Sequence, residues 1–311
     1  MGGLFLSPLI VKVYCPWFER NQQALIMTVN YDSKWHIKNA SDIRTRLSPH
    51  LDTKELAQII PSGLQGIFVR TIDDVMELYC YEPETRDLSD IMSRVNLNAP
   101  LDLIAVYSQV MFLTQVWQQL SPKRVYIAGF GGGRLGMAYH HYNGDVFVDG
   151  SDFDPAILEV ARSHFGIEYD DRYSIAAADS AQDLETRETL YDIIIIDVFS
   201  NSGQHASHLA SREFFTTCRR KLNADGVLAI NLIERDPERS AKISNMASVF
   251  PQLMEWRQQG SHIVFASKTE ACKHALLKRA ETFERDANLT FPYSEHAKAL
   301  QLVDLAEYRF G

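Results

Sequence analysis

The chain has 311 residues, of which 46% are hydrophobic and 23% are charged, and its formal net charge at pH 7 is −9. This length and composition predict a folded globular protein of one large domain or two. The acidic charge and the absence of a Lys/Arg run argue against a nucleic-acid partner. The four cysteines are scattered and form no Cys-x-x-Cys pair, so they indicate neither a zinc site nor a disulfide framework.

Targeting signals are also missing from the sequence. The N-terminal segment has no basic region or cleavage site of the kind that signal peptides carry. No apolar run approaches the roughly 20 residues needed to cross a membrane. We therefore expect a cytoplasmic protein without a membrane partner.

The first third of the chain is predicted to be rich in β-strands. Short β-rich segments lie at Leu9–Cys15, Ala24–Tyr31, Gly66–Ile72 and Val75–Tyr81. Between the second and third of these, apolar residues at helical spacing predict a helix over Leu51–Ile60. The expected unit is a small β-rich domain over residues 1–99.

The remainder, residues 100–311, is predicted to form an α/β domain with a doubly wound sheet. Apolar residues recur at helical spacing from Pro100 to about Leu120, which predicts one long helix. Strands are then expected at 125–129, 145–150, 174–178, 192–197 and 227–232, and helices at 134–142, 155–165, 211–222 and 238–250. Residues 253–257 and 262–267 predict a terminal antiparallel hairpin, and the tail beyond Lys268 is expected to be helical. This alternation is typical of a parallel sheet covered by helices.

The most informative motif is the glycine-dense turn that follows the first of these strands. Gly129, Gly131 and Gly133 allow the backbone to turn tightly and to approach a ligand closely, beside the free N–H groups of the next helix. Asp152 ends the second strand, about 20 residues on, where nucleotide-binding βαβ units place the acceptor for ribose hydroxyls. The pattern predicts a nucleoside-binding site without a metal ion.

Several further stretches occur in an order that resembles the spermidine synthase (polyamine aminopropyltransferase) family, over roughly residues 66–267. They are residues 93–100, the helix around Tyr107, the turn 129–133, and residues 152–155, 172–180, 191–197 and 222–228. The resemblance implies an N-terminal β-domain before a Rossmann-like domain of the class I methyltransferase type. It also implies a decarboxylated S-adenosylmethionine donor, a small-molecule amine acceptor, and dimers or tetramers.

Within this frame, each acidic strand end receives an expected role. Asp152 would accept hydrogen bonds from the ribose hydroxyls, and Asp179 would meet the adenine amino group. Asp197 and Tyr107 are the expected catalytic residues, because an amine nucleophile must lose a proton before it attacks carbon. Each residue could instead have a purely structural role. Asp152 would then be a capping carboxylate and Asp179 a solvated acid in a loop. Asp197 would be a structural residue at a strand end, and Tyr107 would be a core residue.

The chain also departs from the family pattern on the acceptor side. The family usually has Gly-Gly-Gly-Asp-Gly in the turn, and here Gly132 occupies the position of its Asp. Ser200 stands where a second carboxylate usually follows Asp197, and Met92 replaces a common Gln. These changes leave two alternatives open: an S-adenosylmethionine-dependent methyltransferase, or a catalytically silent protein that kept the nucleoside pocket.

Overall fold

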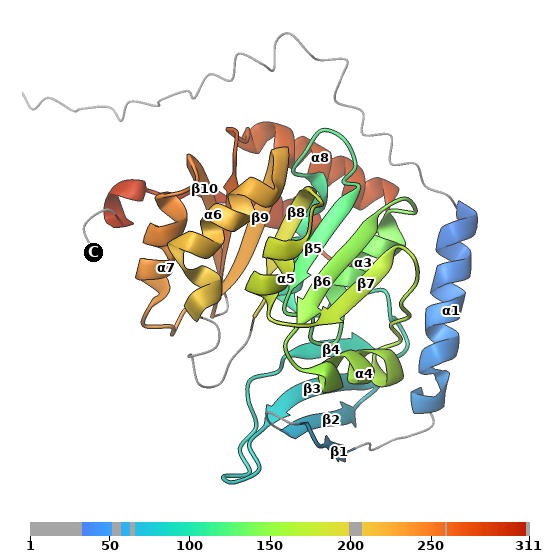
Figure 1. Ribbon diagram of the computed structural model, residues 1–311. Helices are drawn as coiled ribbons and strands as arrows, with labels where there is room; N and C mark the ends of the chain where they lie inside the picture. The colour runs from blue at the N-terminus through green and yellow to red at the C-terminus, as the bar shows by residue number, and fades with distance from the viewer. Residues whose placement is uncertain (1–32, 52–56, 63–65, 199–206, 259, 309–311) are drawn as a thin grey trace, which may run out of the picture.

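Two β-sheets organise the chain, a small one and a large one (Figure 1). The computed structural model describes residues 33–51, 57–62, 66–198, 207–258 and 260–308. The strands predicted at Leu9–Cys15 and Ala24–Tyr31 lie outside the described residues. In the part of the chain that is described, no helix is both long and apolar enough to cross a membrane.

The large sheet has eight strands in the order β12-β10-β11-β9-β8-β5-β6-β7. Its parallel strands are β5 (Arg124–Ala128), β6 (Phe147–Asp152), β7 (Tyr173–Ala177), β8 (Tyr191–Ile196) and β9 (Leu222–Ile233). Antiparallel strands β10 (Gln252–Gln258), β11 (Ser261–Ser267) and β12 (Gln301–Leu302) complete one side. Strand order reverses at β5, which lies between β6 and β8, and ligands of open α/β sheets bind at such a switch point.

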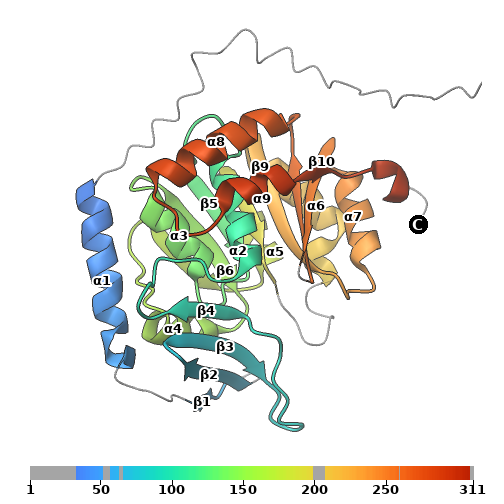
Figure 2. The ribbon, with the colours of Figure 1, turned by 180° about the vertical axis from the view of Figure 1, so that it is seen from behind.

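Helices cover both faces of the large sheet (Figures 1 and 2). One face carries α5 (Ser180–Thr186), α6 (Arg212–Lys221) and α7 (Arg239–Ala247), which pack on one apolar cluster. The other face carries α2 (Val106–Met111), α3 (Arg134–Tyr142), α4 (Pro155–His164), α8 (Lys273–Asp286) and α9 (Tyr293–Ala299). Apolar β8 residues Ile193–Ile196 are buried between these layers, as the sequence predicts for a central strand.

The small sheet is antiparallel and lies below the carboxyl ends of the large one (Figure 1). Its strands are β1 (Ala57–Ile60), β2 (Gly66–Ile72), β3 (Val75–Tyr81) and β4 (Ser93–Asn96). Helix α1 (Ser33–Leu51) precedes this sheet in the chain but packs against α3, where Asn39 contacts His141 at 3.0 Å. A domain boundary near residue 100 stays a prediction.

The predicted fold class is confirmed, with a mixed sheet, a terminal antiparallel hairpin and a small β-rich region before it. Two predicted helices differ from the structure. The helix expected over Leu51–Ile60 is wrong, because α1 ends at Leu51 and Ala57–Ile60 form a strand paired with β2. Isoleucines at positions 59 and 60 also suit a strand, so pairing with a neighbour overrides a short helical spacing.

The long helix predicted from Pro100 to Leu120 is shorter and tighter than expected. Helix α2 spans only Val106–Met111 and continues as a 3₁₀-helix, η1, over Phe112–Val116. The Thr114 hydroxyl donates to the Met111 carbonyl at 2.8 Å, three residues back, and so competes for an acceptor of the α-helical ladder. The apolar spacing was therefore a sign of burial rather than of one continuous helix.

Candidate active site

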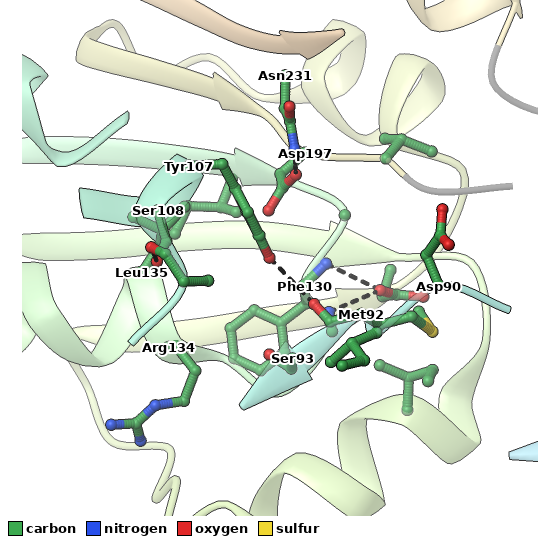
Figure 3. Close-up of a pocket in the computed structure, with 18 of the residues that line it drawn as sticks. Asp90, Met92, Ser93, Tyr107, Ser108, Phe130, Arg134, Leu135, Asp197 and Asn231 are labelled. Atoms are coloured by element: carbon green, nitrogen blue, oxygen red, sulfur yellow. Dashed lines mark hydrogen bonds between the residues drawn. The ribbon is translucent and has the colours of Figure 1, made fainter. Parts of the chain in front are cut away.

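A cavity of about 820 Å³ lies at the carboxyl ends of β5 to β9 and is closed on one side by the small sheet. Figure 3 shows that Tyr107, Asp197, Phe130 and Met92 surround it. All but one of the predicted site residues line it: Tyr107, Gly129, Gly131, Asp152, Asp179 and Asp197. The exception, Gly133, is the N-cap residue of α3 and does not line the cavity.

The glycine turn has the geometry that its sequence predicts. Gly129 has φ +81°, and a Cβ there would lie 2.4 Å from the carbonyl oxygen of Asp197. Gly133 has φ +69°, and its Cβ would meet the Phe130 ring at 2.7 Å. Both positions therefore need glycine, for backbone conformation and for space. Gly129 brings the end of β5 into direct contact with the residue that follows β8.

Gly131 and Gly132 differ in the room around them. At Gly132, a Cβ would lie 2.7 Å from Ser93 Oγ and 2.8 Å from the Phe165 ring, so no side chain fits. At Gly131, the nearest atom would be 3.8 Å away, and this residue lines the cavity. Of these two turn positions, Gly131 borders the cavity, while Gly132 packs against Ser93 and Phe165. In either case the turn brings no carboxylate to the cavity.

Asp152 holds the glycine turn in place through its carboxylate. Its Oδ2 accepts N–H groups from Phe130 at 2.8 Å and Gly131 at 3.3 Å, and its Oδ1 accepts the N–H of Asp154 at 3.1 Å. Burial raises the pKa of Asp152, while these backbone donors oppose that rise. Each carboxylate oxygen can accept more than one hydrogen bond, so capacity for a ligand hydroxyl remains.

Asp154 has the structural role that its position before Pro155 indicates. Its Oδ1 accepts the N–H of Ala156 at 2.9 Å and caps α4. Its Oδ2 is buried without a hydrogen-bond partner among the described residues. The side chain is only 4% exposed.

Asp179 combines a helix cap with a contact to the loop after β8. Its Oδ1 accepts the N–H groups of Ala181 and Gln182, at 3.0 and 3.1 Å, and so caps α5. Its Oδ2 lies 2.8 Å from Nε2 of His208. His208 therefore contacts the acid at the end of β7 and not Asp197. Residues 199–206, which include Ser200 and His205, lie outside the described part of the chain.

Asp197 follows β8 directly and points one oxygen into the cavity (Figure 3). The side-chain amide of Asn231, on the neighbouring strand β9, donates to the other oxygen, Oδ1, at 2.9 Å. Burial raises the pKa of Asp197 to about 6, and the Asn231 hydrogen bond opposes that rise. A carboxylate with a pKa near 6 is ionised at neutral pH and is still basic enough to accept a proton.

Tyr107 faces Asp197 across the cavity from helix α2. Its hydroxyl donates to the Met92 carbonyl oxygen at 3.0 Å and so links α2 to the small sheet. Burial raises the pKa of Tyr107 well above its usual range, and the charge of Asp197 adds to this effect. The hydroxyl therefore stays protonated and can serve only as a hydrogen-bond donor or acceptor.

Sequence reasoning missed several residues that line the cavity. Asn231 is one, since its role arises from its register beside β8 (Ile196 pairs with Ile230) and not from a motif. The acids Glu82, Asp90 and Glu234 are others, and Asp90 pairs with Arg235 across the cavity rim. In the described residues, no group of three or more His, Cys, Asp or Glu side chains could hold a metal ion.

Comparison with known proteins finds similarity to the same family over the central part of the chain. Residues 106–252 match the sequence model described as Spermine/spermidine synthase domain. The chain is 30% identical to the polyamine aminopropyltransferase of Chromobacterium violaceum over 161 residues, which cover 51% of this chain and 61% of that protein. It is 25% identical to the eEF1A lysine and N-terminal methyltransferase of Xenopus laevis over 201 residues, 58% of this chain and 29% of that protein.

Solved structures agree on the fold. A probable spermidine synthase from Corynebacterium glutamicum superposes with a TM-score of 0.61 at 16% identity, over 82% of this chain and 92% of that one. A spermidine synthase in complex with the transition state analogue AdoDATO superposes with a TM-score of 0.61 at 20% identity, over 83% of this chain and 88% of that one. Human Methyltransferase-like protein 13 in complex with SAH superposes with a TM-score of 0.52 at 23% identity, over 60% of this chain and 91% of that one. The resemblance to spermidine synthases is thus confirmed for sequence and fold.

Proposed function

We propose that this protein is a transferase of the spermidine synthase type, which binds decarboxylated S-adenosylmethionine or S-adenosylmethionine and transfers an aminopropyl group to an amine. The observation that carries the proposal is the pairing of a glycine turn with a half-buried carboxylate, Asp197, at the switch point of the sheet. The chain spans about 61% of the length of the Chromobacterium violaceum aminopropyltransferase that it matches.

The donor nucleoside is assigned to the wall formed by the ends of β5, β6 and β7. Gly129 and Gly131 would approach its sulfonium side, and Asp152 would accept its ribose hydroxyls. Asp179 lies next along this edge and would meet the adenine. Its Oδ2 contact with His208 must open or be shared for that bond to form.

Asp197 is assigned the amine. Its free oxygen would hold the ammonium, accept one proton, and leave a lone pair on nitrogen. That lone pair attacks the carbon beside the sulfonium, the C–S bond breaks, and its electron pair leaves on sulfur as a neutral thioether. Tyr107, protonated and opposite Asp197, would orient the nitrogen.

A methyltransferase is the second candidate, and Gly131 is the observation that favours it. A carboxylate at this position would repel the methionine carboxylate of S-adenosylmethionine, and the open turn has none. In that case the same Asp197 would deprotonate an amine that attacks the methyl carbon.

We also propose that the acceptor is a small-molecule amine, that the protein forms homodimers, and that it works in the cytoplasm. The cytoplasmic assignment is supported by the sequence, in which the four cysteines are scattered without the pattern of a disulfide framework.

Donor binding and turnover test the proposal together. The melting temperature is measured with methylthioadenosine, S-adenosylhomocysteine and both donors, and products are identified by mass spectrometry with a panel of amines. Formation of methylthioadenosine from the decarboxylated donor supports aminopropyl transfer, and formation of S-adenosylhomocysteine supports methyl transfer. Stabilisation by nucleosides without any product would favour a silent binding protein, and no stabilisation by any of them would overturn the proposal.

A further inference from the structure

A second cavity, of about 430 Å³, adjoins the first and lies between the small sheet and the β10–β11 hairpin. Its far wall is formed by Tyr79, Trp256 and Gln258, which do not line the first cavity. The wall common to both cavities consists of residues from the two sheets and α2: Asp90–Arg94, Ala105, Tyr107 and Ser261. A substrate bound beside Tyr107 can therefore extend into the second cavity.

Arg94 is the cationic residue of this common wall. Its Nε donates to Oε1 of Glu77 at 3.1 Å, and the side chain is 39% exposed. The Glu77 side chain is 10% exposed. Its Oε2 also accepts hydrogen bonds from the guanidinium of Arg70, at 2.9 Å, and from the hydroxyl of Tyr79, at 2.5 Å. One carboxylate thus neutralises only one of two guanidinium groups, which leaves the group of Glu77, Arg70 and Arg94 with a net positive charge.

The other charged groups nearby do not cancel this excess. Asp90, the acid of the common wall, is already paired with Arg235. Three further acids, Glu82, Asp197 and Glu234, line the first cavity but not the second, and Asp197 uses one oxygen for Asn231. Charge is therefore separated along the connected space, with carboxylates at the strand ends and a guanidinium on the small sheet. Because an arginine fork matches carboxylate geometry, an anionic group is the natural occupant near Arg94.

On the basis of the proposed function, we infer that Arg94 binds a substrate carboxylate and that the second cavity holds the carboxylate end of that substrate. This carboxylate has two sources. It is either the methionine carboxylate of an undecarboxylated donor, or a carboxylate carried by the amine acceptor. In both cases the preferred donor and acceptor together contain a carboxylate, which decarboxylated S-adenosylmethionine and putrescine both lack.

The donor source is tested by calorimetry with S-adenosylhomocysteine, which has the carboxylate, and methylthioadenosine, which lacks it. If the donor supplies the group, Arg94→Gln weakens S-adenosylhomocysteine binding at least about tenfold and leaves methylthioadenosine binding unchanged. Arg94→Lys should retain part of the affinity. Arg70→Gln is the matched control, because Arg70 binds the same Glu77 but lines neither cavity.

The acceptor source is tested with the protein saturated with methylthioadenosine. If the acceptor supplies the group, 4-aminobutyrate raises the melting temperature more than putrescine of the same chain length, and Arg94→Gln removes the difference. The inference is overturned if wild-type protein prefers neither S-adenosylhomocysteine over methylthioadenosine nor 4-aminobutyrate over putrescine. It is also overturned if Arg70→Gln has the same effect as Arg94→Gln. Methylthioadenosine binding that persists in that case would leave the proposed function standing.

Discussion

The two sides of the cavity to which we assign the donor and the acceptor, called the donor side and the acceptor side below, use their carboxylates differently. On the donor side, Asp152 and Asp179 already accept five hydrogen bonds from backbone N–H groups, three and two respectively. On the acceptor side, Asp197 has one side-chain partner among the described residues, Asn231, and its pKa is raised to about 6. Bonds to N–H groups build a binding surface, whereas a poorly solvated carboxylate is prepared for proton transfer.

This contrast predicts that the largest loss of activity comes from Asp197. Asp197→Asn keeps the shape and the position beside Asn231 but removes the proton acceptor. Turnover should fall by about 10²- to 10⁴-fold, while affinity for methylthioadenosine changes less than about threefold. Single-turnover product formation and calorimetry on the same preparation measure both quantities. Full activity in this variant would show that Asp197 is a structural strand-end residue.

Asp152 should show the opposite pattern, with binding lost before chemistry. Asp152→Ala removes the acceptor of the Phe130 and Gly131 N–H groups and of a ribose hydroxyl, so nucleoside affinity should fall at least about tenfold. Asp152→Asn retains one oxygen, so its nucleoside affinity should lie between those of the wild type and Asp152→Ala. Calorimetry gives the affinities, and circular dichroism checks that the variants are folded. Unchanged affinity in a folded Asp152→Ala protein would remove this residue from the donor site.

The raised pKa of Asp197 predicts a pH dependence with a definite sign. Below pH 6 the carboxylate gains a proton and no longer serves as a base, so turnover should fall about tenfold for each pH unit. Stability changes in the opposite direction, because the folded state holds this proton more tightly than the unfolded chain does. The free energy of unfolding contributed by Asp197 is greatest below pH 4 and is lost as pH rises to 6.

Denaturant unfolding between pH 4 and 7 checks the second half of this prediction. Asp197→Asn cannot titrate, so the wild type should lose stability relative to this variant as pH rises. Parallel curves for the two proteins, together with turnover that stays constant down to pH 5, would contradict the assignment.

The smallest expected effect separates backbone strain from crowding in the turn that joins the two sides. Gly129 and Gly260 have nearly the same φ, +81° and +80°, but only Gly129 would place a Cβ against another atom, the Asp197 carbonyl oxygen. In both alanine variants the left-handed backbone conformation should lower the free energy of unfolding by about 1–2 kcal/mol. Gly129→Ala should lower it further, because its Cβ also meets the Asp197 carbonyl oxygen. Chemical denaturation measures both variants, and equal losses would show that the contact with Asp197 relaxes without cost.

The sequence alone determined the large sheet and the donor side. Long alternating segments carry a periodicity that local geometry enforces, and the observed α3, Arg134–Tyr142, matches its predicted bounds. The glycines of the turn and Asp152 follow β5 and β6 directly, so strand order was sufficient to bring them together. The fold and the nucleoside wall therefore depend mainly on local signals.

Tertiary structure decided the acceptor side. Arg94 and Glu77 belong to the small sheet, Tyr107 to α2 and Asn231 to β9, and no spacing along the chain relates these residues. Asn231 meets Asp197 because β9 pairs with β8, and Gly131 has room because Ser93 and Phe165 crowd Gly132 and not its neighbour. The contacts of Arg94 with Glu77, Tyr107 with Met92 and Asn231 with Asp197 join residues 17, 15 and 34 positions apart. They depend on how the two sheets and α2 pack, and the free energy of that packing is shared by the whole core.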